Sequence, residues 1–80
     1  MARRINMPIQ VTCQRQAPMA FLWQKQSYTI TQIIERWREC GEWWEKAPEI
    51  TVYQVLTDTQ GLYELHHMAT GQWLLYKIYD

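Results

Sequence analysis

Three short runs of alternating apolar and polar residues, joined by tight connections, constrain the fold of this 80-residue chain more than any other feature. The runs cover residues 50–57, 62–68 and 73–79. Side chains at successive positions of a β-strand point to opposite faces of a sheet, so this alternation predicts strands. The connections at 58–61 and 69–71 each contain a glycine and are short enough for hairpins. The second half of the chain is therefore predicted to be an antiparallel three-stranded meander.

The first half of the chain shows the same alternation less regularly. Residues 19–23 place Met, Phe and Trp on one face and Ala and Leu on the other, and after a polar turn at 24–26 the alternation resumes at 28–31. This pattern predicts a hairpin. Residues 11–16 are compatible with a short edge strand or an extended lead-in, because they run into a proline, which is tolerated at sheet edges.

One segment and one turn leave specific structural questions. Within residues 31–40, helical spacing of the apolar residues would leave the charged side chains facing solvent. A continued strand with a bulge would also place Ile34 inside, and because Ile33 and Ile34 are β-branched we favour the strand. In the connection at 58–61, we expect Gly61 to supply a positive φ.

These elements predict one mainly β domain over residues 10–80. We expect about five antiparallel strands that form a curled sheet or a small SH3-like or OB-like barrel, with one short helix as the alternative within 31–40. Residues 1–9 lack a clear period and contain Pro8, so we expect a flexible N-terminal arm. A chain of this length supports a single core, which the five Trp, five Tyr and one Phe must largely fill.

Charge and cysteine content favour a soluble cytoplasmic protein without a membrane partner. Eight basic and eight acidic residues balance overall, but residues 1–40 carry a formal charge of +4 and residues 41–80 a charge of −4. In a compact fold two such halves more often neutralise each other than form a basic face. Cys13 and Cys40 lack the paired spacing of zinc or redox sites, so we expect two free thiols. No apolar run approaches the roughly 18 residues of a membrane span.

No motif in the chain is typical of catalysis or metal binding. The three glycines are isolated at turns and do not form a phosphate loop. His66 and His67 are neighbours and would point to opposite faces of a strand, so we expect surface or cross-strand histidines. A thiol, an imidazole and a carboxylate can be combined from Cys40, His67 and Glu42, but their spacing does not single them out. We predict no catalytic residue, no cofactor and no metal.

The densest cluster of recognition groups begins within the ambiguous segment 31–40 and continues beyond it. It consists of Arg36, Trp37, Arg38, Glu42, Trp43 and Trp44. Arginines beside exposed aromatic rings bind single-stranded nucleic acid, and the same residue types are enriched at protein interfaces. In the alternative interpretation, Trp37 and one of Trp43 or Trp44 plug the barrel end while an acidic residue pairs with an arginine. Two adjacent indoles in a short loop are rarely both buried, so we select the six residues as a candidate binding surface.

Several short motifs in the chain occur together in one known family. They include Phe21-Leu22-Trp23, the segment from Ile33 to Arg38, Gly41-Glu42-Trp43-Trp44 and the closing Tyr79-Asp80. Through these motifs, from about Pro18 to Asp80, the chain resembles a small bacterial family of unknown function. Members of that family occur alone or at the C-terminal end of Y-family DNA polymerase-like proteins. The chain departs from the family at His67-Met68, where an Arg-Asp pair is usual. The resemblance implies a setting in translesion synthesis and DNA repair and assigns no reaction.

These observations predict a non-enzymatic protein-interaction module, an accessory to translesion synthesis or DNA repair. Its protein partner is unidentified, and a Y-family polymerase-like protein is one candidate. Binding of single-stranded nucleic acid is the first alternative, which the charge of residues 1–40 favours and the zero net charge opposes. A small uncharacterised enzyme is the second alternative. Open sheet edges permit dimerisation, so both a monomer and a homodimer fit the sequence.

Overall fold

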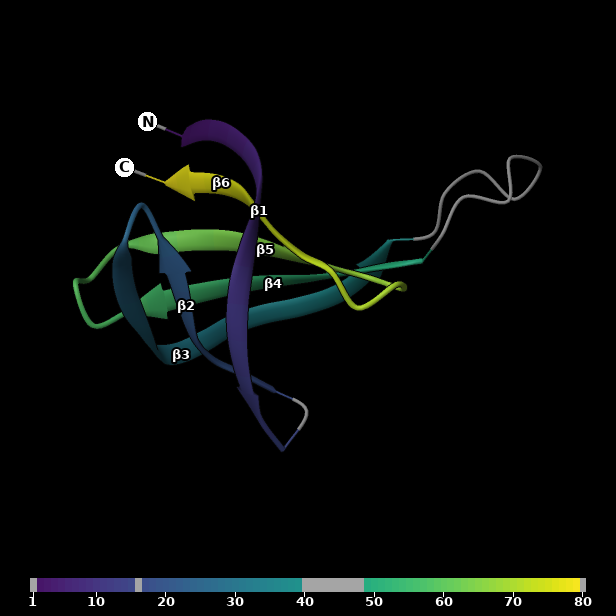
Figure 1. Cartoon of the computed structure of the whole chain (residues 1–80), viewed down its shortest axis with the longest axis horizontal. Coiled ribbons are helices and arrows are strands. Elements are labelled where there is room, and N and C mark those ends of the chain that lie inside the picture. The colour runs from purple at the N-terminus through teal and green to yellow at the C-terminus, as the bar shows by residue number, and fades with distance from the viewer. Residues whose placement is uncertain (1, 16, 40–48, 80) are drawn as a thin grey trace.

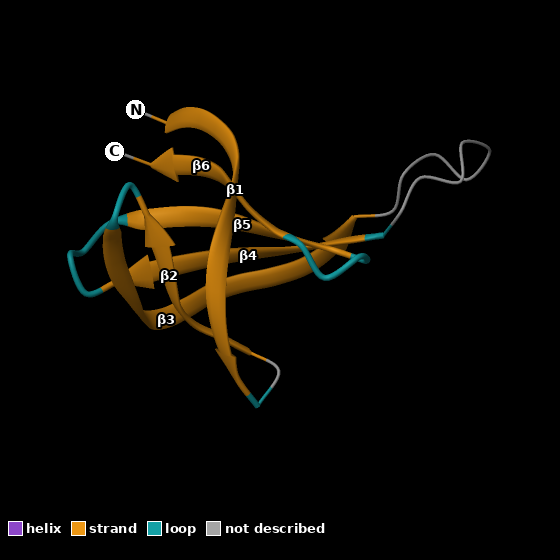
Figure 2. Cartoon of the chain, viewed as in Figure 1, coloured by secondary structure: helices purple, strands orange, loops and turns teal. Residues whose placement is uncertain are grey.

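The computed structural model describes residues 2–15, 17–39 and 49–79, and these residues form an antiparallel β-barrel without helix (Figures 1 and 2). Its six strands are β1 (Ala2–Gln14), β2 (Ala17–Trp23), β3 (Gln26–Glu39), β4 (Ile50–Thr57), β5 (Leu62–Met68) and β6 (Trp73–Tyr79). Each strand pairs with the next, and β6 pairs with β1 to close the barrel. The prediction of a small, mainly β antiparallel barrel is confirmed, with one strand more than expected.

The barrel consists of two sheets that share β1 and β3. Sheet A, as we call it, consists of β3 from Ile30 onward, then β4, β5 and β6, and finally the part of β1 up to Ile9, each paired with the next. Sheet B contains the rest of β1, β2 and the part of β3 up to Thr29. Figure 1 shows β3 curving out of its pairing with β2 and continuing beside β4. Sheet B is therefore shorter than sheet A and covers only part of its inner face.

Aromatic rings fill the space between the two sheets. Phe21, with 1% of its surface exposed, stacks on Tyr28 with ring centroids 5.1 Å apart. Phe21 and Tyr63 meet in an edge-to-face arrangement, with ring centroids 5.4 Å apart and an angle of 72° between the planes. Val55 and Leu65 of sheet A complete this part of the core and are fully buried. Large rings thus supply the burial that a chain of this length needs.

The prediction of a flexible arm over residues 1–9 does not agree with the structure. Residues 2–9 belong to β1 and pair with β6. Ile5 and Ile9 pack against the core, which holds this part of the strand in place. The register shifts between Arg4 and Met7, where Asn6 has a φ of 52°. This irregularity interrupts the period of two, which explains why the sequence pattern did not indicate a strand.

The structure resolves residues 31–39 as part of strand β3, in agreement with the favoured interpretation. Two irregularities interrupt its pairing with β4, one at Thr31 and one at Ile34. Ile33 lies opposite Val55 and Glu35 opposite Gln54, so Ile34 is the extra residue of a bulge. The prediction that the bulge would place Ile34 inside is wrong, because its side chain is 44% exposed.

The two hairpin turns at 24–25 and 58–61 rely on left-handed residues other than glycine. Gln24 and Lys25 have φ values of 52° and 64°, the pattern of a two-residue turn that matches the twist of the strands. In the second turn the positive φ belongs to Gln60, at 65°, so the expectation for Gly61 is wrong. Gly61 is required for space instead: a Cβ atom there would lie 2.7 Å from Cε2 of Tyr63.

Candidate functional site

At the end of sheet A where β3 extends beyond its pairing with β2, the inner face borders a cavity of about 330 Å³, which we call the arginine groove. Its lining residues are Cys13, Arg36, Arg38, Thr51, Tyr53, His67 and Trp73. A second hollow of about 280 Å³ shares Arg38, Thr51 and His67 and extends the groove toward the turn between β5 and β6. Five strands contribute to the groove, so its shape depends on the barrel as a whole.

The two arginines face the groove because of their register against β4. Arg36 lies opposite Tyr53 and Arg38 opposite Thr51, and directly opposed residues share a face of the sheet. Trp37 lies opposite Val52 and therefore on the outer face, where its Nε1 donates a hydrogen bond to Glu39 Oε1 at 3.1 Å. The structure thus brings Arg36 and Arg38 together and separates Trp37 from them. Trp37 neither lines the groove nor plugs the barrel.

The two arginines differ in their ion pairing. Arg38 Nη1 lies 3.3 Å from Glu49 Oε1, and the two side chains are 66% and 48% exposed, so this surface pair is weak. Within residues 2–15, 17–39 and 49–79, the exposed Arg36 has no ion-pair partner. Among the described residues, the groove therefore offers Arg36 without an ion-pair partner beside Arg38, which has one.

Aromatic rings form the floor of the arginine groove. The imidazole of His67 stacks on the indole of Trp73 with centroids 4.1 Å apart and an angle of 5° between the planes. Tyr53 packs against the same indole at 5.3 Å. Only 8% of Trp73 and 5% of Tyr53 is exposed. The floor is therefore rigid and well packed, and these two rings present little free surface to a ligand.

The other predicted binding residues, Glu42, Trp43 and Trp44, lie outside the residues that the structure describes. Cys40 lies outside them as well. In the sequence all four residues stand between the end of β3 and the start of β4, the two strands that carry the arginines and their partners. The arginine groove is thus defined without them.

The adjacent histidines of β5 have different surroundings. The structure contradicts a surface position for His66, which is 8% exposed. Its ring stacks on Tyr76 of the neighbouring strand, as expected of a cross-strand histidine, with centroids 4.1 Å apart. Its Nε2 lies 2.9 Å from Glu64 Oε2. Sequence reasoning missed Glu64, although the spacing of two residues between Glu64 and His66 places both on one face of a strand.

A hydroxyl group completes this buried cluster on the outer face of sheet A. Tyr79 Oη donates a hydrogen bond of 2.8 Å to Glu64 Oε1. Burial, this hydrogen bond and the nearby carboxylate raise the pKa of Tyr79 above its usual value of about 10. Throughout the described part of the chain, no buried side-chain nitrogen or oxygen lacks a hydrogen-bond partner. The cluster is thus satisfied internally, and we assign it a structural role.

Two of the described residues that line the arginine groove carry groups found in catalytic sites, a thiol and an imidazole. Cys13 and His67 both face it, but no hydrogen bond joins the thiol to the imidazole among the residues described. A nucleophilic cysteine needs such a base. In the same part of the chain, no three His, Cys, Asp or Glu residues gather as a metal site would require. The described residues also contain no helix that could span a membrane.

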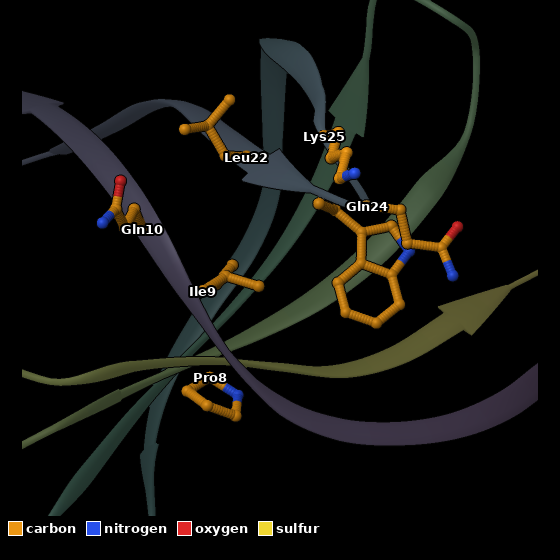
Figure 3. Close-up of a pocket in the computed structure, with 7 residues that line it drawn as sticks. Pro8, Ile9, Gln10, Leu22, Gln24 and Lys25 are labelled. Atoms are coloured by element: carbon orange, nitrogen blue, oxygen red, sulfur yellow. The ribbon is translucent and has the colours of Figure 1, made fainter.

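A further cavity of about 570 Å³ lies between β1 and the turn that joins β2 to β3. Figure 3 shows Leu22, Gln24 and Lys25 on one side of it and Pro8 and Ile9 on the other. Lys25 is the one ionisable residue among those that line it. Because the arginine groove combines two cations with a rigid floor, we select the groove as the candidate functional site.

Comparisons with known proteins identify a family and no assigned role. No curated protein matches the chain, and no solved structure matches it. A family profile covers residues 1–80 and is described as a domain of unknown function, DUF6504. This range includes all six strands of the barrel and every residue that lines the arginine groove. The chain therefore belongs to the DUF6504 family.

Proposed function

We propose that this chain is a non-enzymatic interaction module that binds an acidic segment of a protein partner in the arginine groove. The observation that carries the proposal is the exposed Arg36, which has no ion-pair partner among the described residues and stands next to Arg38. A guanidinium group binds a carboxylate through two parallel hydrogen bonds, an interaction stronger than one between neutral groups. The buried rings of Tyr53 and Trp73 line the same groove as both arginines.

Two features favour an acidic peptide over single-stranded nucleic acid. Nucleic acid binds to such grooves by stacking its bases on exposed rings, yet Tyr53 and Trp73 are almost fully buried. The zero net charge also provides little of the electrostatic attraction that polyphosphate binding requires. The ion pair of Arg38 with Glu49 is an internal example of the proposed contact.

The proposed partner belongs to an assembly for translesion synthesis or DNA repair in a bacterial cytoplasm, and a Y-family polymerase-like protein is the first candidate. The support for this setting is the sequence resemblance, which includes Arg36 and Arg38. The groove adds a chemical criterion for choosing among candidate partners. A suitable partner exposes a flexible segment rich in Asp and Glu.

A binding experiment with two labelled probes tests the proposed function. The probes are a 12-residue peptide rich in Asp and Glu and a 12-residue oligothymidylate, each followed by fluorescence anisotropy at several salt concentrations. We expect the Arg36→Ala, Arg38→Ala double variant to bind the peptide at least tenfold more weakly, since charged hydrogen bonds contribute about 1.5–3 kcal/mol each. Lys25→Ala, a change in the turn between β2 and β3, serves as the matched control and should bind normally.

Two results of that experiment would contradict the proposal. Equal peptide binding by the double variant and the original chain would exclude the arginine groove as the site. Tighter binding of oligothymidylate than of peptide, with affinity that falls steeply as salt rises, would instead identify nucleic acid as the partner.

A further inference from the structure

Among the described residues, a long part of β3 has no neighbouring strand on one side. β2 pairs with β3 only between Gln26 and Thr29, and Ala17 and Pro18 at the start of β2 pair with β1 alone. From Ile30 to Glu39, β3 pairs with β4 alone among the described residues. Figure 1 shows this second half of β3 running beside β4 after β2 has diverged. Outside the two bulges at Thr31 and Ile34, every second residue of this edge directs its backbone N–H and C=O groups outward.

An apolar hollow lies where the free edge begins. Its volume is about 270 Å³, and residues 17–19 of β2 and 30–33 of β3 line it. Met19 and Ile33 are 40% and 36% exposed, so apolar surface remains open to solvent there. The hollow is large enough to receive an aliphatic side chain, and burial of that surface would favour binding.

The hollow and the arginine groove follow each other along the same face of β3. Ile33 lies opposite Val55 and Arg36 opposite Tyr53, two core residues that stand two positions apart on β4. Ile33 and Arg36 therefore occupy successive inner positions of the edge strand. A strand added to this edge would place one side chain beside Ile33 and the side chain two residues further along beside Arg36.

We infer that the free edge of β3 binds the partner as an added β-strand, with an apolar residue in the hollow and an acidic residue two positions away at Arg36. This inference rests on the proposed function and specifies the conformation and pattern of the partner. Backbone hydrogen bonds to the edge supply affinity, and the two side-chain contacts supply specificity. Arg38 favours a second acidic residue another two positions along.

A second copy of this chain is a less suitable occupant of the edge. In a two-fold antiparallel pairing of β3 with itself centred on Trp37, Arg36 would oppose Arg38 of the other copy. In the same pairing Glu35 would oppose Glu39. Like charges directly opposite each other destabilise a strand pair. The charges of the edge thus disfavour self-association and favour an acidic strand.

Methylated peptides test the added strand directly. The probe is a labelled, threonine-rich peptide of eight residues with valine at its third position and aspartate at its fifth and seventh. Two isomers carry N-methyl groups on alternate backbone amides, one on the odd and one on the even positions. A strand that docks on an edge uses only one of these sets, so we expect one isomer to bind at least tenfold more weakly than the unmodified peptide and the other to bind equally well.

Protein variants test the two side-chain contacts. Arg36→Glu should weaken binding of the aspartate peptide at least tenfold, and a peptide with lysines in place of the aspartates should restore binding to that variant. Met19→Gln should weaken binding of the valine peptide severalfold and leave a peptide with threonine at that position unaffected. Lys25→Glu is the control and should bind as the original chain does.

The possible failures separate the two proposals. Equal binding of both methylated isomers, with loss of binding in Arg36→Glu, would overturn the added strand and leave the acidic-peptide function intact. Preference for oligothymidylate over every peptide would overturn both. A dimer in analytical ultracentrifugation that excludes the peptide would show that a second copy occupies the edge, and would also overturn the inference.

Discussion

The two ends of the inner face of sheet A differ in what covers them. At one end sheet B lies over the face, and Phe21 packs against Tyr28 and Tyr63 at ring separations of 5.1 and 5.4 Å. At the other end β2 no longer pairs with β3, Cys13 of β1 lines the groove, and the same face carries Arg36 and Arg38, both exposed. Strand β3 contributes to both ends, because it continues ten residues beyond its pairing with β2.

This difference separates the residues that stabilise the barrel from those available for binding. Buried rings at the covered end remove apolar area from water, which is the main favourable contribution to folding. Among the described residues, the arginines at the open end form one ion pair, that of Arg38 with Glu49, so their removal should leave the fold intact. Substitutions at the covered end should consequently lower stability, and substitutions of the arginines at the open end should weaken binding without lowering stability.

The largest expected effect is at the covered end. Phe21→Ala should lower the free energy of unfolding by about 3–5 kcal/mol, because it removes a fully buried ring that contacts two others. Arg36→Ala should change the same quantity by no more than about 0.5 kcal/mol. Urea denaturation followed by tryptophan fluorescence measures both values. Should Phe21→Ala not fold, the milder Phe21→Leu provides the comparison.

A similar loss of stability in Phe21→Leu and Arg36→Ala would break the distinction between the two ends. It would mean that Arg36 supports the barrel, and loss of binding in its variants would then have to be attributed to loss of structure.

Gly61→Ala should have an intermediate effect on the covered end. The added Cβ would lie 2.7 Å from the ring of the buried Tyr63, and overpacking of this kind costs about 1–3 kcal/mol. In a Tyr63→Leu background the same substitution should cost much less, since the ring is absent. A double-mutant cycle by urea denaturation measures this coupling.

Gly71→Ala is the matched control for that cycle. No atom of the described residues lies within 4 Å of a Cβ at Gly71, but its φ of 98° disfavours any residue other than glycine. Its cost should therefore be the same with Tyr63 or with leucine at position 63. Coupling of Gly71 to Tyr63, or none for Gly61, would contradict the steric role that we assign to Gly61.

The smallest expected effect concerns the outer face and appears at alkaline pH. The pKa of Tyr79 is raised in the folded chain, so its neutral form contributes stability that is complete below the unfolded pKa of about 10 and is lost as pH rises through the folded value. Tyr79→Phe should remove this contribution. Urea denaturation of both chains from pH 8 to pH 11 should show a steeper fall for the original chain, and parallel curves would refute the assignment.

Part of the candidate site was predictable from the sequence. Arg36 and Arg38 stand two residues apart, and once a strand is chosen they must share a face. The same rule places Trp37 on the opposite face, although the cluster was selected as a unit. Tyr53, His67 and Trp73 could not be added from the pattern, because their meeting with the arginines depends on the pairing of β3, β4, β5 and β6.

The sequence by itself determined that this chain forms antiparallel strands, since a period of two residues and short turns are local properties that fix hairpins between neighbours. The tertiary structure decided where β1 and β3 pass from one sheet to the other and where the bulges at Thr31 and Ile34 fall. Those choices depend on how two twisted sheets pack around the rings of Phe21, Tyr28 and Tyr63. Contacts between residues distant in the sequence thus left one end of sheet A uncovered.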